Sequence, residues 1–172
     1  EMHRMSRAMF YGLITDPQSF DYNRFCHYAW SDADARHVLE RNPAHCAFES
    51  VGARMIHWWA ACYARTGDEK CLDYAQRMTD KWRPVQHPES GLVPDFFGAV
   101  ASKPGAPMPP GEWTECRGAS LASLAYLDAA AELQAREGGA ALSRQLSEMA
   151  ERMALGVARN SYDGERRLFI EH

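Results

Sequence analysis

One arrangement of helix signals occurs twice in this chain, and that repeat limits the folds it can adopt. A long stretch with apolar residues three or four positions apart ends at a glycine, and a second such stretch follows within a few residues. The breaks are at Gly67 and Gly138, which lie about 71 residues apart. Each unit predicts a helical hairpin followed by a long connection, so the chain is predicted to be all-α, with antiparallel helical hairpins in an array.

The same signals give the ranges of the predicted helices. We expect four long ones, over residues 47–65, 68–82, 114–136 and 141–159. Gly67 suits the left-handed conformation that often closes a helix, and Asp68 can cap the helix that follows. Pro84 ends the second helix because proline has no backbone N–H to donate. Beyond the fourth helix, residues 166–172 are expected to form a loop or a short strand.

Between the two hairpins lies a proline-rich connection, residues 83–117. It holds seven of the nine prolines in the chain and is far longer than the usual connection of ~4–6 residues. Its apolar residues, including Phe96, Phe97 and Trp113, need a surface to pack on, so we expect an ordered loop over 84–113 at the mouth of the helical domain. The alternative is a long connection with a purely structural role.

The short turns also predict where a binding site lies. They make neighbouring helices antiparallel, so the connections 16–31 and 84–117 are expected together at the opposite end. The end with the tight turns is expected to have too little chain to build a pocket. Four side chains are expected to face one cleft at the loop end: His27, His87, Asp95 and Trp113.

Composition narrows the class of protein. A chain of 172 residues is long enough for one domain with a core, and 46% apolar and 24% charged residues are typical of soluble globular proteins. The net charge of −4 argues against a nucleic-acid partner, and no apolar run long enough for a membrane span occurs. Five cysteines without a CxxC motif favour reduced, buried thiols and a cytoplasmic location, with a periplasmic one open if a signal segment is removed.

The sequence TGDEKCLDYAQRMTDKW followed by HPESGLVPD resembles the (α/α) toroids of carbohydrate-active enzymes, over roughly residues 44–160. The resemblance implies inner and outer helices that alternate around a ring, with a substrate cleft built by the long loops on one face. A complete ring needs more hairpins than this chain contains. We therefore expect either one helical domain over residues 1–172 or a part of a larger toroid, whose remainder would then be its partner.

Within that group of enzymes, a lyase acting on an acidic polysaccharide is the first hypothesis. β-Elimination from a uronic acid needs a group that neutralises the carboxylate and a base that removes the neighbouring proton. Five residues of suitable types lie close together: Tyr22, Asn23, Arg24, His27 and Tyr28. We assign catalysis to Tyr22, Arg24 and His27, and substrate binding to Asn23 and Tyr28. The alternative is that the aromatic residues pack and that Arg24 pairs with an acid.

A glycoside hydrolase is the second hypothesis, because two carboxylates on or beside the mouth loop can serve as acid and base. The candidates are Asp95, Glu112 and Glu115, of which we assign catalysis to Asp95 and Glu115. Trp113 can stack on a sugar ring, and Arg117 can bind a carboxylate. The alternative is that Glu115 stabilises a helix N-terminus and Asp95 orders the loop.

A divalent metal ion is a further hypothesis. His27, Glu49 and His87 look similar to the scattered His and Glu ligands of toroid pectate lyases. In those enzymes a His-Pro pair follows a catalytic arginine, whereas Gln86 precedes His87 here, which leaves Arg83 as the nearest substitute. A rival pair is His45 with Glu49, and the ordinary role for His87 is to cap its loop.

The sequence thus predicts a carbohydrate-active enzyme with a saccharide substrate, with the lyase preferred over the hydrolase. A non-catalytic helical scaffold or binding domain is the alternative from another class. No phosphate-binding loop, GxGxxG or GxSxG motif occurs, so nucleotide and serine-hydrolase functions have no support.

Overall fold

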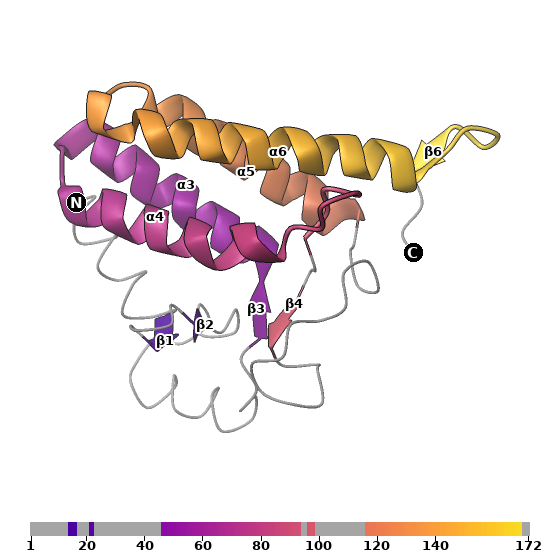
Figure 1. The fold of residues 1–172 in the computed structure, drawn as a ribbon, viewed down its shortest axis with the longest axis horizontal. Helices are drawn as coiled ribbons and strands as arrows, with labels where there is room; N and C mark the ends of the chain where they lie inside the picture. Colours follow the sequence, from indigo (N-terminus) through magenta and orange to yellow (C-terminus); the bar gives the residue numbers. More distant parts are fainter. Residues whose placement is uncertain (1–13, 17–20, 23–45, 94–95, 99–115, 170–172) are drawn as a thin grey trace.

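The computed structural model describes residues 14–16, 21–22, 46–93, 96–98 and 116–169, with side chains over 49–93 and 116–169. Helices make up most of this part of the chain (Figure 1). The long helices are α3 (Glu49–Thr66), α4 (Glu69–Trp82), α5 (Cys116–Leu133) and α6 (Ala140–Asn160). Two 3-10 turns are η2 (Arg83–Val85) and η3 (Glu137–Gly139). The predicted all-α class and the two predicted hairpins, α3–α4 and α5–α6, are confirmed for the described residues.

Short antiparallel strand pairs accompany the helices. β1 (Ile14–Asp16) pairs with β2 (Asp21–Tyr22), β3 (Cys46–Phe48) with β4 (Phe96–Gly98), and β5 (Tyr162–Asp163) with β6 (Leu168–Phe169). The last pair agrees with the short strand expected within residues 166–172. The first two pairs were not expected from the sequence.

The tight turn between α3 and α4 forms as predicted. Gly67 has a φ of 73°, and its N–H donates to the carbonyl of Tyr63 at 2.7 Å. Asp68 caps α4, because its Oδ1 accepts a hydrogen bond from the N–H of Lys70 at 3.0 Å. A non-glycine residue at position 67 would have to adopt the left-handed backbone conformation, in which its Cβ lies too close to the following carbonyl oxygen.

Two predicted helix ends were wrong. Residues 47 and 48 belong to β3 instead of the first helix, because Ala47 pairs with Phe97 and Phe48 with Phe96 in β4. The pairing of β3 with the distant strand β4 outweighs the helical spacing of apolar residues in the local sequence here. The third helix ends at Leu133 instead of 136, since residues 134–136 form weaker turn hydrogen bonds of 3.2–3.4 Å to carbonyls three residues back.

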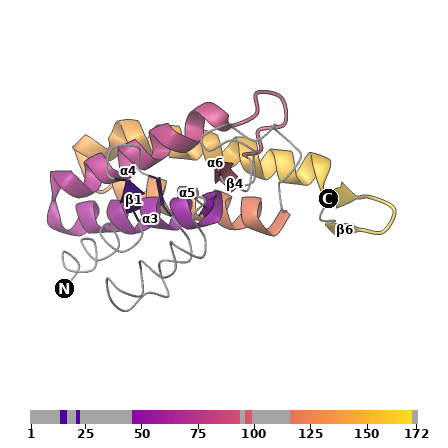
Figure 2. The same cartoon turned by 90° about the horizontal axis from the view of Figure 1, so that it is seen from below.

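The four helices form two layers. α5 packs against both α3 and α6, and α3 packs against α4. Figure 2 shows α3 and α5 in one layer and α4 and α6 in the other. Hydroxyl groups tie the second hairpin together, as Ser123 Oγ donates to the carbonyl of Ala150 at 2.9 Å and Ser143 Oγ to that of Ala130 at 2.8 Å.

The core lies between these layers. Trp59, whose ring lies 5.5 Å from that of Tyr74, is fully buried and belongs to this core. Its neighbour Trp58 is only partly buried, as expected for adjacent residues on different sides of a helix. Among the core side chains with no exposed surface are Trp59, Trp82, Tyr126, Ile56, Met78, Leu133 and Leu146. In the described part of the chain, no helix is long and apolar enough to cross a membrane.

The two ends of the helices differ. The turn between α3 and α4 and the turn between α5 and α6 lie at one end of the helices (Figure 1). At the other end, β3 leads into α3 and pairs with β4, which follows α4, while β2 contacts β3. The segment before α3 and the connection after α4 therefore lie side by side. This arrangement agrees with the expectation that the connections gather at one end, as far as they are described.

Candidate functional site

Residues 87–93 form a compact loop at the end where the connections gather. The N–H of His87 donates to the carbonyl of Leu92 at 2.8 Å, and the N–H of Gly91 donates to that of His87 at 2.9 Å. The side chain of His87 also takes part, because its Nδ1 accepts a hydrogen bond from the N–H of Ser90 at 3.1 Å. Leu92 and Val93 are buried in the core. The loop is thus ordered, and His87 caps it.

The loop is fixed to α6 by hydrogen bonds from two side chains. Gln86, which is buried, donates through Nε2 to the carbonyls of Gly91 at 2.8 Å and Met149 at 3.0 Å. Arg152 on α6 donates through Nη2 to the carbonyls of His87 and Pro88, both at 3.1 Å. Backbone acceptors of the loop are therefore satisfied by the helix and by Gln86.

Two glycines allow this close approach. Gly91 has a φ of 73°, and a Cβ at this position would collide with the carbonyl oxygen of Arg152. A Cβ on Gly156 of α6 would collide with the carbonyl oxygen of Ser90. The loop and the helix touch backbone to backbone, so each contact requires glycine.

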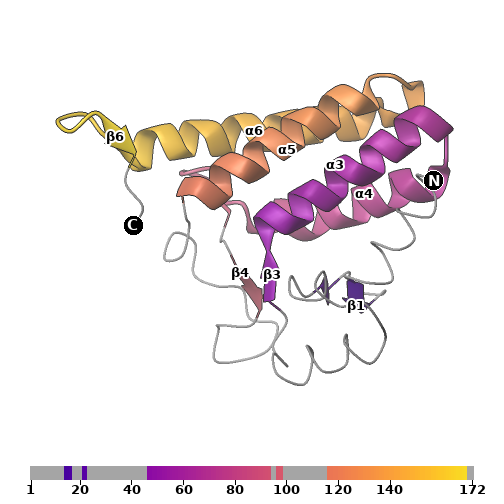
Figure 3. The same ribbon diagram turned by 180° about the vertical axis from the view of Figure 1, so that it is seen from behind.

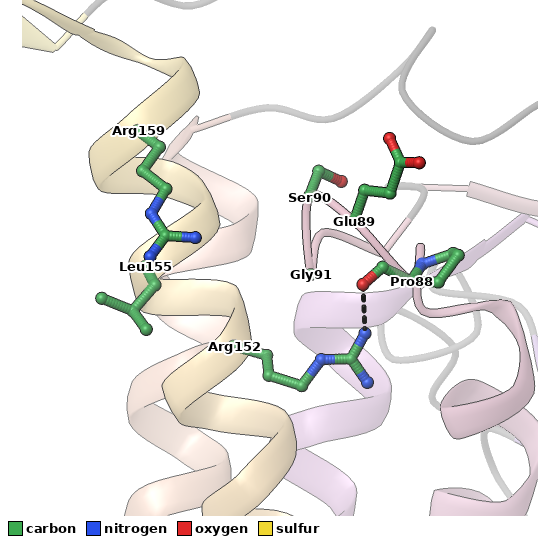
Figure 4. A pocket seen from close by; sticks show the side chains of 7 residues that line it. All are labelled: Pro88, Glu89, Ser90, Gly91, Arg152, Leu155 and Arg159. Carbon is green, nitrogen blue, oxygen red and sulfur yellow. Dashed lines mark hydrogen bonds between the residues drawn. The ribbon is translucent and has the colours of Figure 1, made fainter.

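A pocket of about 220 Å³ lies between this loop and α6 (Figure 4). Its lining consists of Pro88, Glu89, Ser90, Gly91, Arg152, Leu155 and Arg159. Arg152 and Arg159 are seven residues apart, which places them on one face of the helix. Figure 4 shows their side chains on the helix wall and the carboxylate of Glu89 on the loop wall. Within the described ranges, no hydrogen bond or ion pair engages Arg159.

The chemistry of this pocket follows from its guanidinium groups. Arg152 uses one nitrogen for the loop carbonyls, and Arg159 presents a fork of N–H donors at the exposed rim. Such a fork matches a carboxylate or a phosphate. Glu89 and the hydroxyl of Ser90, on the opposite wall, add acceptors for hydroxyl groups. The pocket is suited to a small ligand that carries both an acidic group and hydroxyls.

A second polar pair lies inside the molecule, between α3 and α5. Glu49 is only 2% exposed, and its Oε1 accepts a hydrogen bond from the hydroxyl of Tyr126 at 3.0 Å. Glu49 is the first residue of α3, where the helix dipole favours a negative charge. The pair joins α3 to α5, which favours a structural role for Glu49.

The predicted site residues are only partly described. Tyr22 lies in β2, and Arg117 is exposed in the first turn of α5. Glu49 and His87 lie in the places given above. The others lie outside the described residues: Asn23, Arg24, His27, Tyr28, Asp95, Trp113 and Glu115, together with the rival candidates His45 and Glu112. Their assignment to catalysis or substrate binding stays a prediction.

The predicted metal site has two of its three ligands in the described part. His87 already uses Nδ1 to accept from Ser90, which leaves Nε2 for another partner, and Glu49 binds Tyr126. Among the described residues, no group of three His, Cys, Asp or Glu side chains could hold a metal ion. His27 lies outside them, so the set of His27, Glu49 and His87 stays a prediction.

The expectation that the tight-turn end forms no pocket was wrong. A pocket of about 300 Å³ lies there between α4 and α6, and its lining includes Glu69, Leu72, Asp73 and Gln76. These two helices belong to different hairpins and are not joined by a turn, so a groove remains between them. Its acidic side chains make it a poor match for an anionic ligand.

The residues of α6 that build the loop-end pocket were not predicted as site residues from the sequence. Arg152 and Arg159 lie within the predicted helix 141–159, and their spacing of seven residues puts them on one face. Gly156 interrupts the same helix, and an isolated glycine inside a helical pattern often marks a close approach by another segment. Those two signals could have pointed to α6.

Comparisons with protein-family models, with curated proteins and with solved structures give no match for this chain.

Proposed function

We propose that this chain is a carbohydrate-active protein of the (α/α) toroid type and that it binds an acidic saccharide at the loop end of its helices. In this proposal α3 and α5 are inner helices and α4 and α6 outer helices of an arc. The two-layer arrangement supports it, because it matches the alternation of inner and outer helices in such rings.

One observation carries the ligand class. The pocket at the loop end has Arg152 and Arg159 on its helix wall and Glu89 and Ser90 on its loop wall. A uronic acid offers the complementary groups, since its carboxylate suits a guanidinium fork and its hydroxyls suit acceptors. We assign carboxylate binding to Arg159, because Arg152 already binds the loop carbonyls.

Cleavage by β-elimination is the proposed reaction. Arg24 neutralises the substrate carboxylate, and Tyr22 or His27 removes the neighbouring proton. The electron pair of the broken C–H bond forms a carbon–carbon double bond as the bond to the glycosidic oxygen breaks, and that oxygen takes the proton held by the base. The roles rest on residue types and their spacing in the sequence. If Asp95 and Glu115 act instead, the reaction is hydrolysis and no double bond forms.

The test is incubation of the full chain with oligouronates and with neutral oligosaccharides of the same length. A lyase produces an ultraviolet-absorbing unsaturated product together with reducing ends, whereas a hydrolase produces reducing ends only. Tyr22→Phe or His27→Ala, whichever removes the base, should abolish lyase turnover, and Asp95→Asn and Glu115→Gln should spare it. Binding without turnover would favour the helical binding domain over either enzyme.

Binding is measured separately with Arg159→Ala. Loss of one charge-assisted contact should raise the dissociation constant for an oligouronate by about tenfold. The matched control is Arg144→Ala, which removes an exposed arginine of the same helix outside the pocket. Equal affinities for the two variants would remove Arg159 from the proposed site.

A further inference from the structure

Helix α5 carries large apolar side chains that the described elements of the chain leave exposed. Leu121 is 39% and Leu124 is 59% exposed. With Arg117 and Asp128 they form a stripe, the α5 seam, whose members are spaced by four, three and four residues. This spacing is that of the contact positions in helices that pair along their length. All four side chains are exposed, so the seam faces away from the core.

The order of residues along the α5 seam is self-complementary. It runs from a cation through two leucines to an anion: Arg117, Leu121, Leu124, Asp128. These residues lie symmetrically about the point between Ala122 and Ser123. A twofold axis at that point places Leu121 of one copy opposite Leu124 of its partner, and Arg117 opposite Asp128. We propose that the chain forms a homodimer in which two α5 helices pair antiparallel through this seam.

Charge decides the direction of pairing. In the antiparallel dimer two Arg117–Asp128 pairs flank the central leucines, whereas a parallel pair would set like charges opposite each other. Asp128 has no hydrogen bond or ion pair to any other described residue. Arg117 has a contact within the chain, but its guanidinium has five N–H donors and can serve a second partner. This gives Arg117 a role other than the predicted binding of substrate.

Among the described helices, α3 runs beside only part of α5 (Figure 3). α3 begins at Glu49, which is hydrogen-bonded to Tyr126, so α3 flanks only the second part of α5. Figure 3 shows the first part of α5 reaching past the start of α3. An antiparallel partner therefore brings its own α3 to the opposite side of the axis. The two loop ends then point in opposite directions.

The α5 seam is short, so the dimer is expected to be weak, in the micromolar range of dissociation constants. Sedimentation equilibrium of the full chain over a range of concentrations should show a monomer–dimer equilibrium. Leu124→Asp should abolish it. The matched control is Leu168→Asp, because Leu168 in β6 is 59% exposed, as Leu124 is, and lies away from the seam. A chain that is monomeric at every concentration, or equal loss in both variants, overturns the proposal.

Charge exchange gives a second test that does not depend on a leucine. Arg117→Asp and Asp128→Arg should each raise the dimer dissociation constant by about tenfold, because each sets like charges opposite each other. The double variant restores opposite charges across the interface, so its dissociation constant should return to within about threefold of the wild type. Circular dichroism confirms that each variant is folded. A double variant that dimerises no better than the single ones would refute antiparallel pairing.

Discussion

Gly156 lies in the middle of a helix because another segment passes against it. Any Cβ at this position meets the carbonyl oxygen of Ser90. Gly156→Ala should lower the free energy of unfolding by about 1–3 kcal/mol, since overpacking outweighs the better helix propensity of alanine. Gly164→Ala is the control, because a Cβ there meets nothing within 4 Å. Urea unfolding of both variants measures the difference, and equal stabilities would mean that the loop does not dock as described.

Tyr126 tests the role of the buried carboxyl group. Tyr126→Phe removes the hydroxyl that donates to Glu49 and leaves a buried acceptor with one partner fewer. The expected loss of stability is about 1–3 kcal/mol. Tyr162→Phe is the matched control, because Tyr162 is 47% exposed and its ring contact with Phe169 does not need the hydroxyl. A Tyr126→Phe variant with unchanged stability would show that Glu49 is held by its other contacts.

Among the secondary-structure elements, the loop 87–93 is anchored to α6 through Gln86. Gln86 joins the carbonyls of Gly91 and Met149, so it links the loop to α6 from inside the core. Gln86→Leu should therefore speed amide hydrogen exchange at His87 and Gly91, whose N–H groups hold the loop closed. Gln145→Leu is the control, since it removes a hydrogen bond to Gln76 far from the loop. Unchanged exchange in Gln86→Leu would contradict this anchoring role.

The elements that were predicted correctly are those whose sequence signals lie within a few residues of one another. Gly67, Asp68 and the apolar spacing act within a few residues, so both hairpins were predicted with nearly correct ends. The local apolar spacing predicts a helix at Phe48, whereas the structure pairs this residue with Phe96, which lies 48 positions away along the chain. No local pattern reports that pairing.

The candidate site was harder to predict for the same reason. His87 was correctly expected to cap its loop, since its partner Ser90 is only three residues away. Arg152 and Gln86 reach across the fold to the loop backbone, and their targets are carbonyl groups that every residue possesses. Residue types led to a prediction of acidic-ligand binding at the loop end, which stays a prediction, and they did not identify α6 as one wall of the pocket.

Across the whole molecule, the pockets at the two ends of the helices differ in the charge of their linings. The two ends also differ in the length of the connections that they carry. The loop-end pocket has Arg152 and Arg159, with one carboxylate from Glu89. The pocket at the tight turns has Glu69 and Asp73 and no basic side chain in its lining. An anionic ligand gains at the first pocket and is repelled at the second. The helical scaffold thus separates two pockets whose linings differ in charge.

The difference between the two pockets predicts which amide groups an acidic saccharide protects from hydrogen exchange. Hydrogen exchange with a saturating oligouronate should slow at residues 83–93 and 152–160 and stay unchanged at 66–73 and 134–142. The reason is that a ligand bound between the loop and α6 restrains their opening, whereas the other end is not in contact with it. A neutral oligosaccharide of the same length is the ligand control, and Arg159→Ala should remove the protection. Protection at the tight-turn segments instead would contradict the proposed site. It would place the ligand in the groove between α4 and α6, whose acidic lining favours a cationic ligand.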